Sequence, residues 1–131
     1  MDFNEKTQYW LELADDDMET ARILYHGNKF HYAGFMCHLS IEKGLKAIIT
    51  NLDDEAIPPK IHDLVKLSKQ SGIYNKMDDK QKDFLEFLLP LNIEARYPSQ
   101  KDNISTSFNN DECNKIIAET EALLDWIKQQ L

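Results

Sequence analysis

The chain has 131 residues, which suits a single domain, residues 1–131, with a sizeable hydrophobic core. Because no apolar run approaches the roughly 20 residues of a membrane span and the N-terminus lacks an apolar signal core, we expect a soluble cytoplasmic protein. The net charge of −8 argues against broad nucleic-acid binding but leaves room for a local basic pocket.

The first predicted helix covers residues 5–26. Residues at alternating spacings of four and three form its inward stripe: Trp10, Ala14, Asp17, Ala21 and Leu24. Asp17 stands out because burying an unpaired carboxylate is costly. We expect this side chain either to be partly exposed at the edge of the stripe or to be buried against Lys43 or Arg96. Gly27 then ends the helix.

The second predicted helix, residues 30–51, is apolar over most of its circumference, which favours burial among several partners. One seam consists of small residues and predicts close packing, against the first helix or across a dimer: Ala33, Cys37, Ser40, Gly44 and Ala47. Its polar residues are Glu42, Lys43 and Lys46. Glu42 and Lys46, four residues apart, form either a solvated surface pair or part of a functional site.

A loop with Pro58-Pro59 separates this helix from a short one at residues 61–70, whose predicted inward residues are Ile61, Leu64, Val65 and Ser68. The next helix opens at Asp78, where Gln81 completes a capping box. Pro90 predicts a kink or an early end in that helix.

We expect a loop at residues 98–108 and a last helix from about Asn109, with Glu112 in capping-box position. The apolar face of that helix is Cys113, Ile116, Ile117, Thr120, Leu123, Leu124, Ile127 and Leu131. The pattern as a whole predicts an all-α fold, an up-and-down four-helix bundle with one short extra helix.

Metal binding and cofactor chemistry have little support in the sequence. A di-iron bundle would place a carboxylate three residues before a histidine on one helix, and that spacing does not occur. His31 and His38 could share a face, but no inward carboxylate of their helix joins them. Cys37 and Cys113 are read as buried thiols of a cytosolic protein, not as a disulfide or a metal site. We therefore expect no metal and no cofactor.

Two further features invite a functional interpretation. Arg96 and Tyr97 follow the fourth helix, where an arginine either caps the helix end or binds a phosphate while the tyrosine offers a stacking face. His62 precedes the short helix and could titrate near neutrality, or it could simply contact the start of that helix.

Taken together, these motifs resemble the HEPN family over nearly the whole chain, from Trp10 to Leu131. The matching segments, in order, are Trp10…Ala14…Asp17…Ala21, Tyr32-Ala33…Ile41-Glu42-Lys43-Gly44-Leu45-Lys46-Ala47, His62-Asp63-Leu64 and Ala95-Arg96-Tyr97-Pro98. The resemblance implies a bundle like the helical domain of kanamycin nucleotidyltransferase, and a homodimer. Such small proteins are often encoded beside a minimal nucleotidyltransferase that they bind, in pairs resembling toxin–antitoxin modules.

Many HEPN proteins are metal-independent ribonucleases, marked by an arginine followed after four to six residues by a histidine. Counted from Arg96, that histidine would occupy one of three positions, which here hold Lys101, Asp102 and Asn103. Arg22 is no substitute, because only three residues separate it from His26. The resemblance therefore implies the fold and nucleotide binding more strongly than RNA cleavage.

Three hypotheses follow from the sequence. The first is a non-catalytic homodimeric module that binds a nucleotide or docks a nucleotidyltransferase, with its ligand site formed by Arg96, Tyr97, Lys43, Lys46 and His62 and with Asp17 and Glu42 as structural polar residues. The second is a divergent ribonuclease that uses Arg96 and His62. The third is a purely structural helical partner.

Overall fold

The computed structural model describes residues 4–94 and 109–131, and within them it contains helices and no strand. In chain order the elements are α1 (Glu5–His26), α2 (Phe30–Leu52), α3 (Leu64–Gln70), the 3₁₀ helix η1 (Tyr74–Lys76), α4 (Asp79–Glu94) and α6 (Asn110–Gln129). The predicted all-α bundle with one short extra α-helix, α3, is therefore confirmed. The boundaries predicted for the first two helices agree with α1 and α2 to within one residue.

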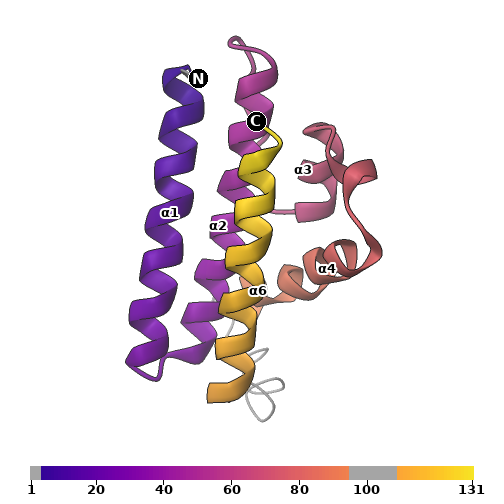
Figure 1. Ribbon diagram of the computed structural model, residues 1–131. Coiled ribbons are helices and arrows are strands. Elements are labelled where there is room, and N and C mark those ends of the chain that lie inside the picture. The colour runs from indigo at the N-terminus through magenta and orange to yellow at the C-terminus, as the bar shows by residue number, and fades with distance from the viewer. Residues whose placement is uncertain (1–3, 95–108) are drawn as a thin grey trace.

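The central helix of the fold is α2, which packs against each of the other four α-helices. Figure 1 shows α1 beside α2 and α6 in front of it, while α3 and α4 form a separate lobe on the side of α2 away from α1. The hydrophobic core surrounds α2, whose Ile41 and Leu45 have no solvent exposure. This arrangement explains why α2 is apolar over so much of its circumference.

The small residues of α2 allow two neighbouring helices to approach closely. Ser40 Oγ donates a hydrogen bond to the carbonyl oxygen of Ala14 on α1, at 2.8 Å. A Cβ atom added to Gly44 would lie 2.9 Å from Cδ1 of Leu124 on α6, closer than side chains normally pack. The seam therefore serves packing within one chain, against both α1 and α6.

The short helix begins later than the sequence predicts, at Leu64 instead of residue 61. The Asp63 carboxylate accepts hydrogen bonds from the backbone N–H groups of Val65 and Lys66, and an aspartate at this cap position fixes the helix start. The inward face is also shifted. Ile61 and Val65 are only half-buried, whereas Leu67 is fully buried, because the first turn of the expected helix is absent.

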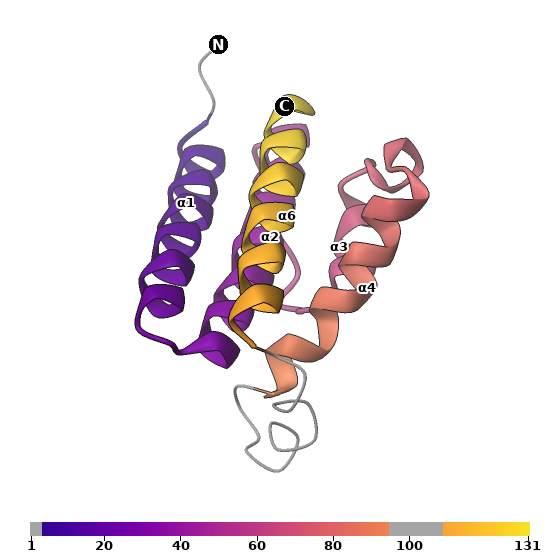
Figure 2. The same cartoon turned by 60° about the horizontal axis from the view of Figure 1, so that its bottom comes forward.

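The start of α4 is the predicted capping box. The Asp78 carboxylate accepts from the Gln81 backbone N–H at 2.7 Å, and the Asp78 N–H donates to the Gln81 side-chain oxygen at 2.9 Å. Pro90 does not end the helix, which continues to Glu94. Figure 2 shows the axis of α4 changing direction toward its C-terminal end, as expected near an internal proline.

The last helix also begins as predicted, because the Asn109 side chain accepts from the Glu112 backbone N–H at 3.0 Å. All the predicted apolar residues within α6 are buried, and Leu131, which follows the end of the helix, is half-buried. The buried thiols predicted at Cys37 and Cys113 are confirmed. Burial raises the pKa of Cys37 to about 12 and that of Cys113 to about 11, so both stay protonated at neutral pH.

Candidate functional site

A buried cluster of charged and aromatic side chains surrounds Glu42 on α2. The Glu42 side chain is 5% exposed, and its Oε2 atom lies 3.1 Å from Lys46 Nζ. Its Oε1 atom accepts a hydrogen bond from His62 Nδ1 at 2.8 Å and lies 3.4 Å from His38 Nε2. The interpretation of Glu42 and Lys46 as a solvated surface pair is therefore wrong, because Glu42 as a whole residue is 4% and Lys46 6% exposed.

His38 connects this cluster to α4. Its ring is fully buried, and Nδ1 lies 3.1 Å from the carbonyl oxygen of Leu88. A carbonyl oxygen can only accept, so Nδ1 carries the hydrogen and Nε2 is the atom that faces Glu42. The sequence reasoning missed this role. The signal was present as the i, i+4, i+8 spacing of His38, Glu42 and Lys46, which places all three on one face of a helix.

The charge state of Glu42 follows from opposing effects. Burial raises the pKa of this carboxyl group, but the adjacent His38 ring, the hydrogen bond from His62 and the charge of Lys46 together lower it to about 2. Glu42 is therefore ionised at neutral pH and acts as the counter-charge of Lys46. The Lys46 ammonium also lies 5.5 Å from the ring centroid of Trp10, which extends the cluster to α1.

A second ion pair lies between α1 and α2. Lys43 Nζ is 2.6 Å from Oδ2 of Asp17, whose side chain is 10% exposed. Of the two readings of Asp17, the structure supports the buried contact, with Lys43 as the partner. Burial raises the pKa of Asp17, and the hydrogen bond and charge of Lys43 offset part of that rise.

Three of the five predicted ligand-binding residues can therefore be placed, and each is already bound to a carboxylate. Lys46 and His62 meet at Glu42, whereas Lys43 pairs with Asp17. Arg96 and Tyr97 lie outside the described residues.

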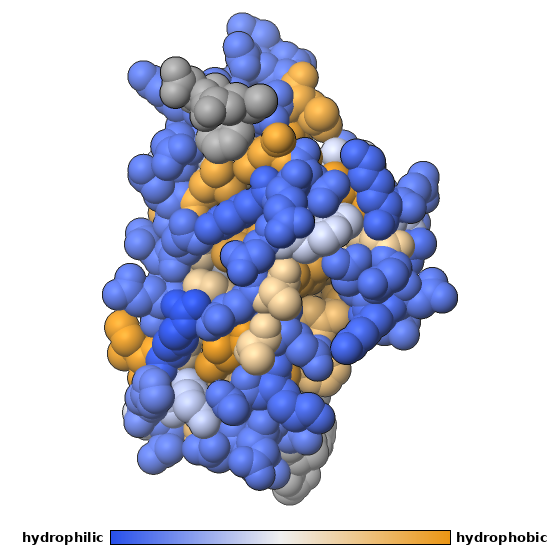
Figure 3. Space-filling view, viewed as in Figure 1, coloured by the Kyte–Doolittle hydropathy of each residue, from blue (hydrophilic) through white to orange (hydrophobic). Residues whose placement is uncertain are grey.

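A groove between α4 and α6 is the second candidate site. It consists of two adjoining hollows of about 280 and 190 Å³ that share Lys80, Phe84 and Glu119. Figure 3 shows apolar residues reaching the surface between the two helices, among hydrophilic ones. The rings of Phe84 and Phe87 are stacked with centroids 6.1 Å apart, and Phe87 is 47% exposed.

The groove walls follow helical periodicity on both sides. Residues at i, i+3, i+4 and i+7 of each helix line the larger hollow, namely Lys80, Asp83, Phe84 and Phe87 of α4 and Glu112, Lys115, Ile116 and Glu119 of α6. Each helix thus presents one continuous stripe with an apolar centre and charged flanks. Two such stripes form a surface suited to a third helix.

Metal and membrane chemistry receive no support from the part of the chain that the structure describes. Within it, no three histidine, cysteine, aspartate or glutamate side chains are grouped so that they could hold a metal ion. No helix among residues 4–94 and 109–131 has the length and apolar character of a membrane span.

Comparison with protein-family models gives one finding: the model described as HEPN domain matches residues 7–130. That match includes α1, α2, α3, α4 and α6. No curated protein and no solved structure matches the chain.

Proposed function

Because this chain belongs to the HEPN family, we propose that it is a non-catalytic module that docks a protein partner through the groove between α4 and α6. The observation that carries this proposal is the paired helical stripe of the groove, with the exposed Phe87 ring on one wall and Ile116 on the other. The half-exposed Phe87 leaves a large apolar ring in water, and a docked helix would cover it.

The cations of the central helix favour docking over nucleotide binding. A phosphate bound at Lys43 or Lys46 would have to displace Asp17 or Glu42, both of which are buried carboxylates. Each displaced carboxylate would then be left without its counter-charge in a poorly hydrated position, which costs several kcal/mol. A solvent-exposed groove can be filled without breaking an existing ion pair.

The partner suggested by the family resemblance is a minimal nucleotidyltransferase, bound by a homodimer of this chain in a pair of the toxin–antitoxin kind. An amphipathic helix of that partner would place apolar residues on Phe84, Phe87 and Ile116. Its flanking charges would meet Lys80 and Asp83 on one wall and Glu112, Lys115 and Glu119 on the other. This mixed rim favours a partner helix that carries both signs of charge.

Ribonuclease activity is the competing function. His62 Nδ1 is bound to the buried Glu42, and the side chain is 44% exposed, so only its outer edge could meet a substrate. Arg22, the arginine among the described residues, forms an ion pair with Glu121 at 2.6 Å. We therefore expect purified protein to leave total RNA intact. Cleavage that is abolished by both Arg96→Ala and His62→Ala would support the ribonuclease instead.

The docking proposal can be tested by substitution at the groove. Phe87→Asp places a charge at its exposed apolar centre, and Ile23→Asp is the matched control because Ile23 is 63% exposed on α1, away from the groove. Native-cell purification followed by mass spectrometry should recover a small nucleotidyltransferase with the unaltered protein and with Ile23→Asp, but not with Phe87→Asp. Equal recovery with both variants would contradict docking at this groove.

A further inference from the structure

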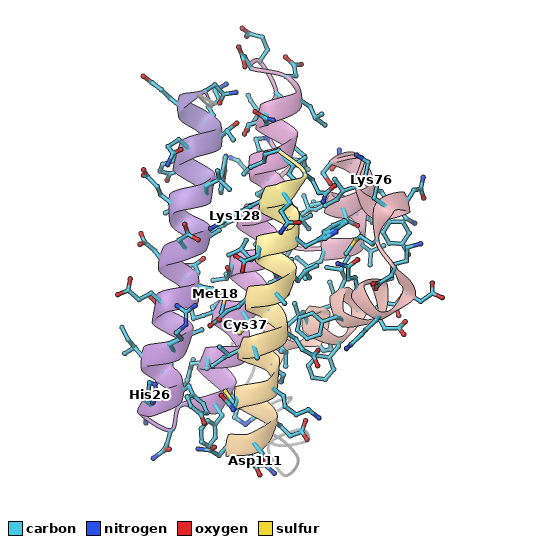
Figure 4. All side chains as sticks on the ribbon, in the orientation of Figure 1. Met18, His26, Cys37, Lys76, Asp111 and Lys128 are labelled. Atoms are coloured by element: carbon cyan, nitrogen blue, oxygen red, sulfur yellow. The ribbon has the colours of Figure 1, made fainter. Side chains whose placement is uncertain are left out.

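An exposed, mainly apolar hollow of about 500 Å³ lies where the start of α1 meets the turn that follows α2. Tyr9 and Trp10 of α1 stand on one side of it, and Ile57 and Pro58 of the turn stand on the other. The hollow lies at the opposite end of α1 from His26, which Figure 4 labels. It shares no residue with the groove between α4 and α6, so the two surfaces are separate.

The two segments around this hollow expose several large apolar side chains. Tyr9 is 57% exposed and Ile57 81%, and Leu52, at the end of α2, is 66% exposed. These are three of the six large hydrophobic side chains that are exposed in the part of the chain that the structure describes. A single exposed hydrophobic residue needs no explanation, but such a concentration marks an interaction site.

Hydrogen bonds from α1 hold the turn that forms the second wall. The Asn4 side chain donates to Asp54 Oδ1 at 2.9 Å, and Lys6 Nζ donates to the carbonyl oxygen of Asp54 at 3.0 Å. Ile57 precedes Pro58, and a residue before proline is restricted to extended backbone. The wall is therefore formed before anything binds, so a ligand would lose little affinity to the ordering of this turn.

The surroundings of the hollow are acidic. Residues 4–10 and 51–60, which include its walls, contain four carboxylates and two lysines, namely Glu5, Asp53, Asp54 and Glu55 with Lys6 and Lys60. All four acidic residues are exposed. No basic side chain among residues 4–94 and 109–131 lies within 4.0 Å of any of these carboxylates. A cation that approached the hollow would therefore find carboxylates that the described lysines and arginine leave unpaired.

We propose that this hollow docks a short peptide segment of a protein partner, in which a large apolar side chain is flanked by lysines or arginines. The apolar side chain enters between Trp10 and Ile57 and covers the exposed isoleucine. The flanking cations lie against Glu5 and the acidic turn at residues 53–55, which is the charge complementarity that steers and orients a partner. The volume of about 500 Å³ falls in the range of about 300 to 1,000 Å³ that is usual for ligand sites.

The fluorescence of Trp10, which lines the hollow, provides the test. Trp126→Phe removes the other tryptophan, and Phe87→Asp blocks the groove between α4 and α6, so the result is independent of docking at that groove. Titration with the peptide Arg-Lys-Leu-Phe-Lys-Arg at low ionic strength should give a saturable change that weakens as salt is added. Peptides with glutamates in place of the basic residues, or serines in place of the apolar pair, should bind about tenfold more weakly. No saturable change, or equal affinity for all three peptides, would overturn the proposal.

Substitution of the apolar wall locates the binding site. Ile57→Ser should weaken binding of the basic peptide about tenfold, because it removes most of the apolar surface that the peptide covers. Ile23→Ser is the matched control, since Ile23 is 63% exposed on α1 and does not line the hollow. Circular-dichroism melting checks that both variants are folded. Equal affinity of the two variants would contradict binding in this hollow.

Substitution of the acidic surroundings tests the charge of the partner. Glu5→Gln/Glu55→Gln should weaken binding of the basic peptide and reduce its salt dependence. The control Glu19→Gln/Asp125→Asn removes the same charge from exposed positions elsewhere on α1 and α6 and should leave both unchanged. Equal effects of the two double variants would contradict the proposal. A Trp10 signal that changes with protein concentration in the absence of peptide would also contradict it, because a second copy of the chain would then fill the hollow.

Discussion

Neutralising Glu42 should destabilise the protein by several kcal/mol, although only one atom of the side chain changes in Glu42→Gln. The substitution removes the counter-charge of Lys46, which is 6% exposed, and it leaves His62 an uncharged amide oxygen as acceptor in place of a carboxylate. Removing one partner of a buried ion pair is costly because the other partner stays charged in a poorly hydrated environment.

The size of the effect follows from the pKa of Glu42. Its ordinary value is 4.5 and its value in the folded protein is about 2. At about 1.4 kcal/mol for each pKa unit, this difference corresponds to about 3 to 4 kcal/mol of folding free energy that depends on the ionised carboxylate. The cost of breaking a buried ion pair, about 3 to 5 kcal/mol, has the same magnitude.

The pH dependence has a definite sign. A carboxyl group whose pKa is lower in the folded state stabilises the fold above its unfolded pKa, and this contribution is lost as the pH falls from about 5 toward 2. Asp17 acts in the opposite direction: its raised pKa disfavours the ionised form in the folded state, and this penalty is relieved as the pH falls. Subtracting the Glu42→Gln profile isolates the Glu42 contribution.

Urea denaturation at a series of pH values measures this prediction. At pH 7, Glu42→Gln should lower the free energy of unfolding by about 3 kcal/mol, whereas Glu12→Gln, which neutralises an exposed carboxylate on α1, should change it by less than about 0.5 kcal/mol. Adding Lys46→Met to Glu42→Gln should restore part of the loss, because no cation is then left unpaired. A Glu42→Gln variant as stable as the unaltered protein would refute the reasoning.

Three further predictions concern the core. Lys43→Met leaves Asp17 buried without its partner and should lower the unfolding free energy, measured by urea denaturation, by about 3 kcal/mol. Adding Asp17→Leu should recover part of this loss, and no recovery would argue against the ion pair. Gly44→Val forces α2 away from Leu124 and should lower the unfolding free energy by about 2 kcal/mol or more. The control Gly27→Ala, at an exposed helix end, should change the unfolding free energy little, and equal effects of the two variants would contradict the close packing of α2 and α6. Cys37 and Cys113 should resist a thiol reagent at pH 8 until the protein is unfolded, and rapid reaction of the native protein would show that they are accessible.

Periodicity and capping chemistry were sufficient to predict most of the fold. The four-and-three spacing in α1, the apolar α2 and the Asp78–Gln81 box are local patterns, and local patterns are visible in a single sequence. The late start of α3 was missed because Ile61 continues the apolar pattern, while Asp63 competes with it by capping the helix. A side-chain hydrogen bond of that kind outweighed the hydrophobic spacing.

The candidate site was less predictable because it depends on which residues meet across helices. The sequence indicated that Asp17 could contact Lys43, because an inward carboxylate needs a partner. It did not indicate that Glu42 is a partner of His62, 20 residues away. The spacing of His38 and Glu42 places both on one face of α2, but the contact of His38 with the Leu88 carbonyl depends on how α4 packs. Likewise, Phe87 belongs to the apolar pattern of α4 but remains half-exposed, because α4 and α6 diverge to form the groove.

The central claim, that the groove between α4 and α6 docks a protein partner, is tested most directly by site-specific photocrosslinking in the native cell. A photoreactive amino acid in place of Phe87 lies in the groove, and the same group in place of Ile23 lies on exposed α1 as the control. The account predicts one crosslinked product from position 87 alone, identified by mass spectrometry as a nucleotidyltransferase joined through an amphipathic helix. The absence of that product, or identical products from both positions, would contradict it.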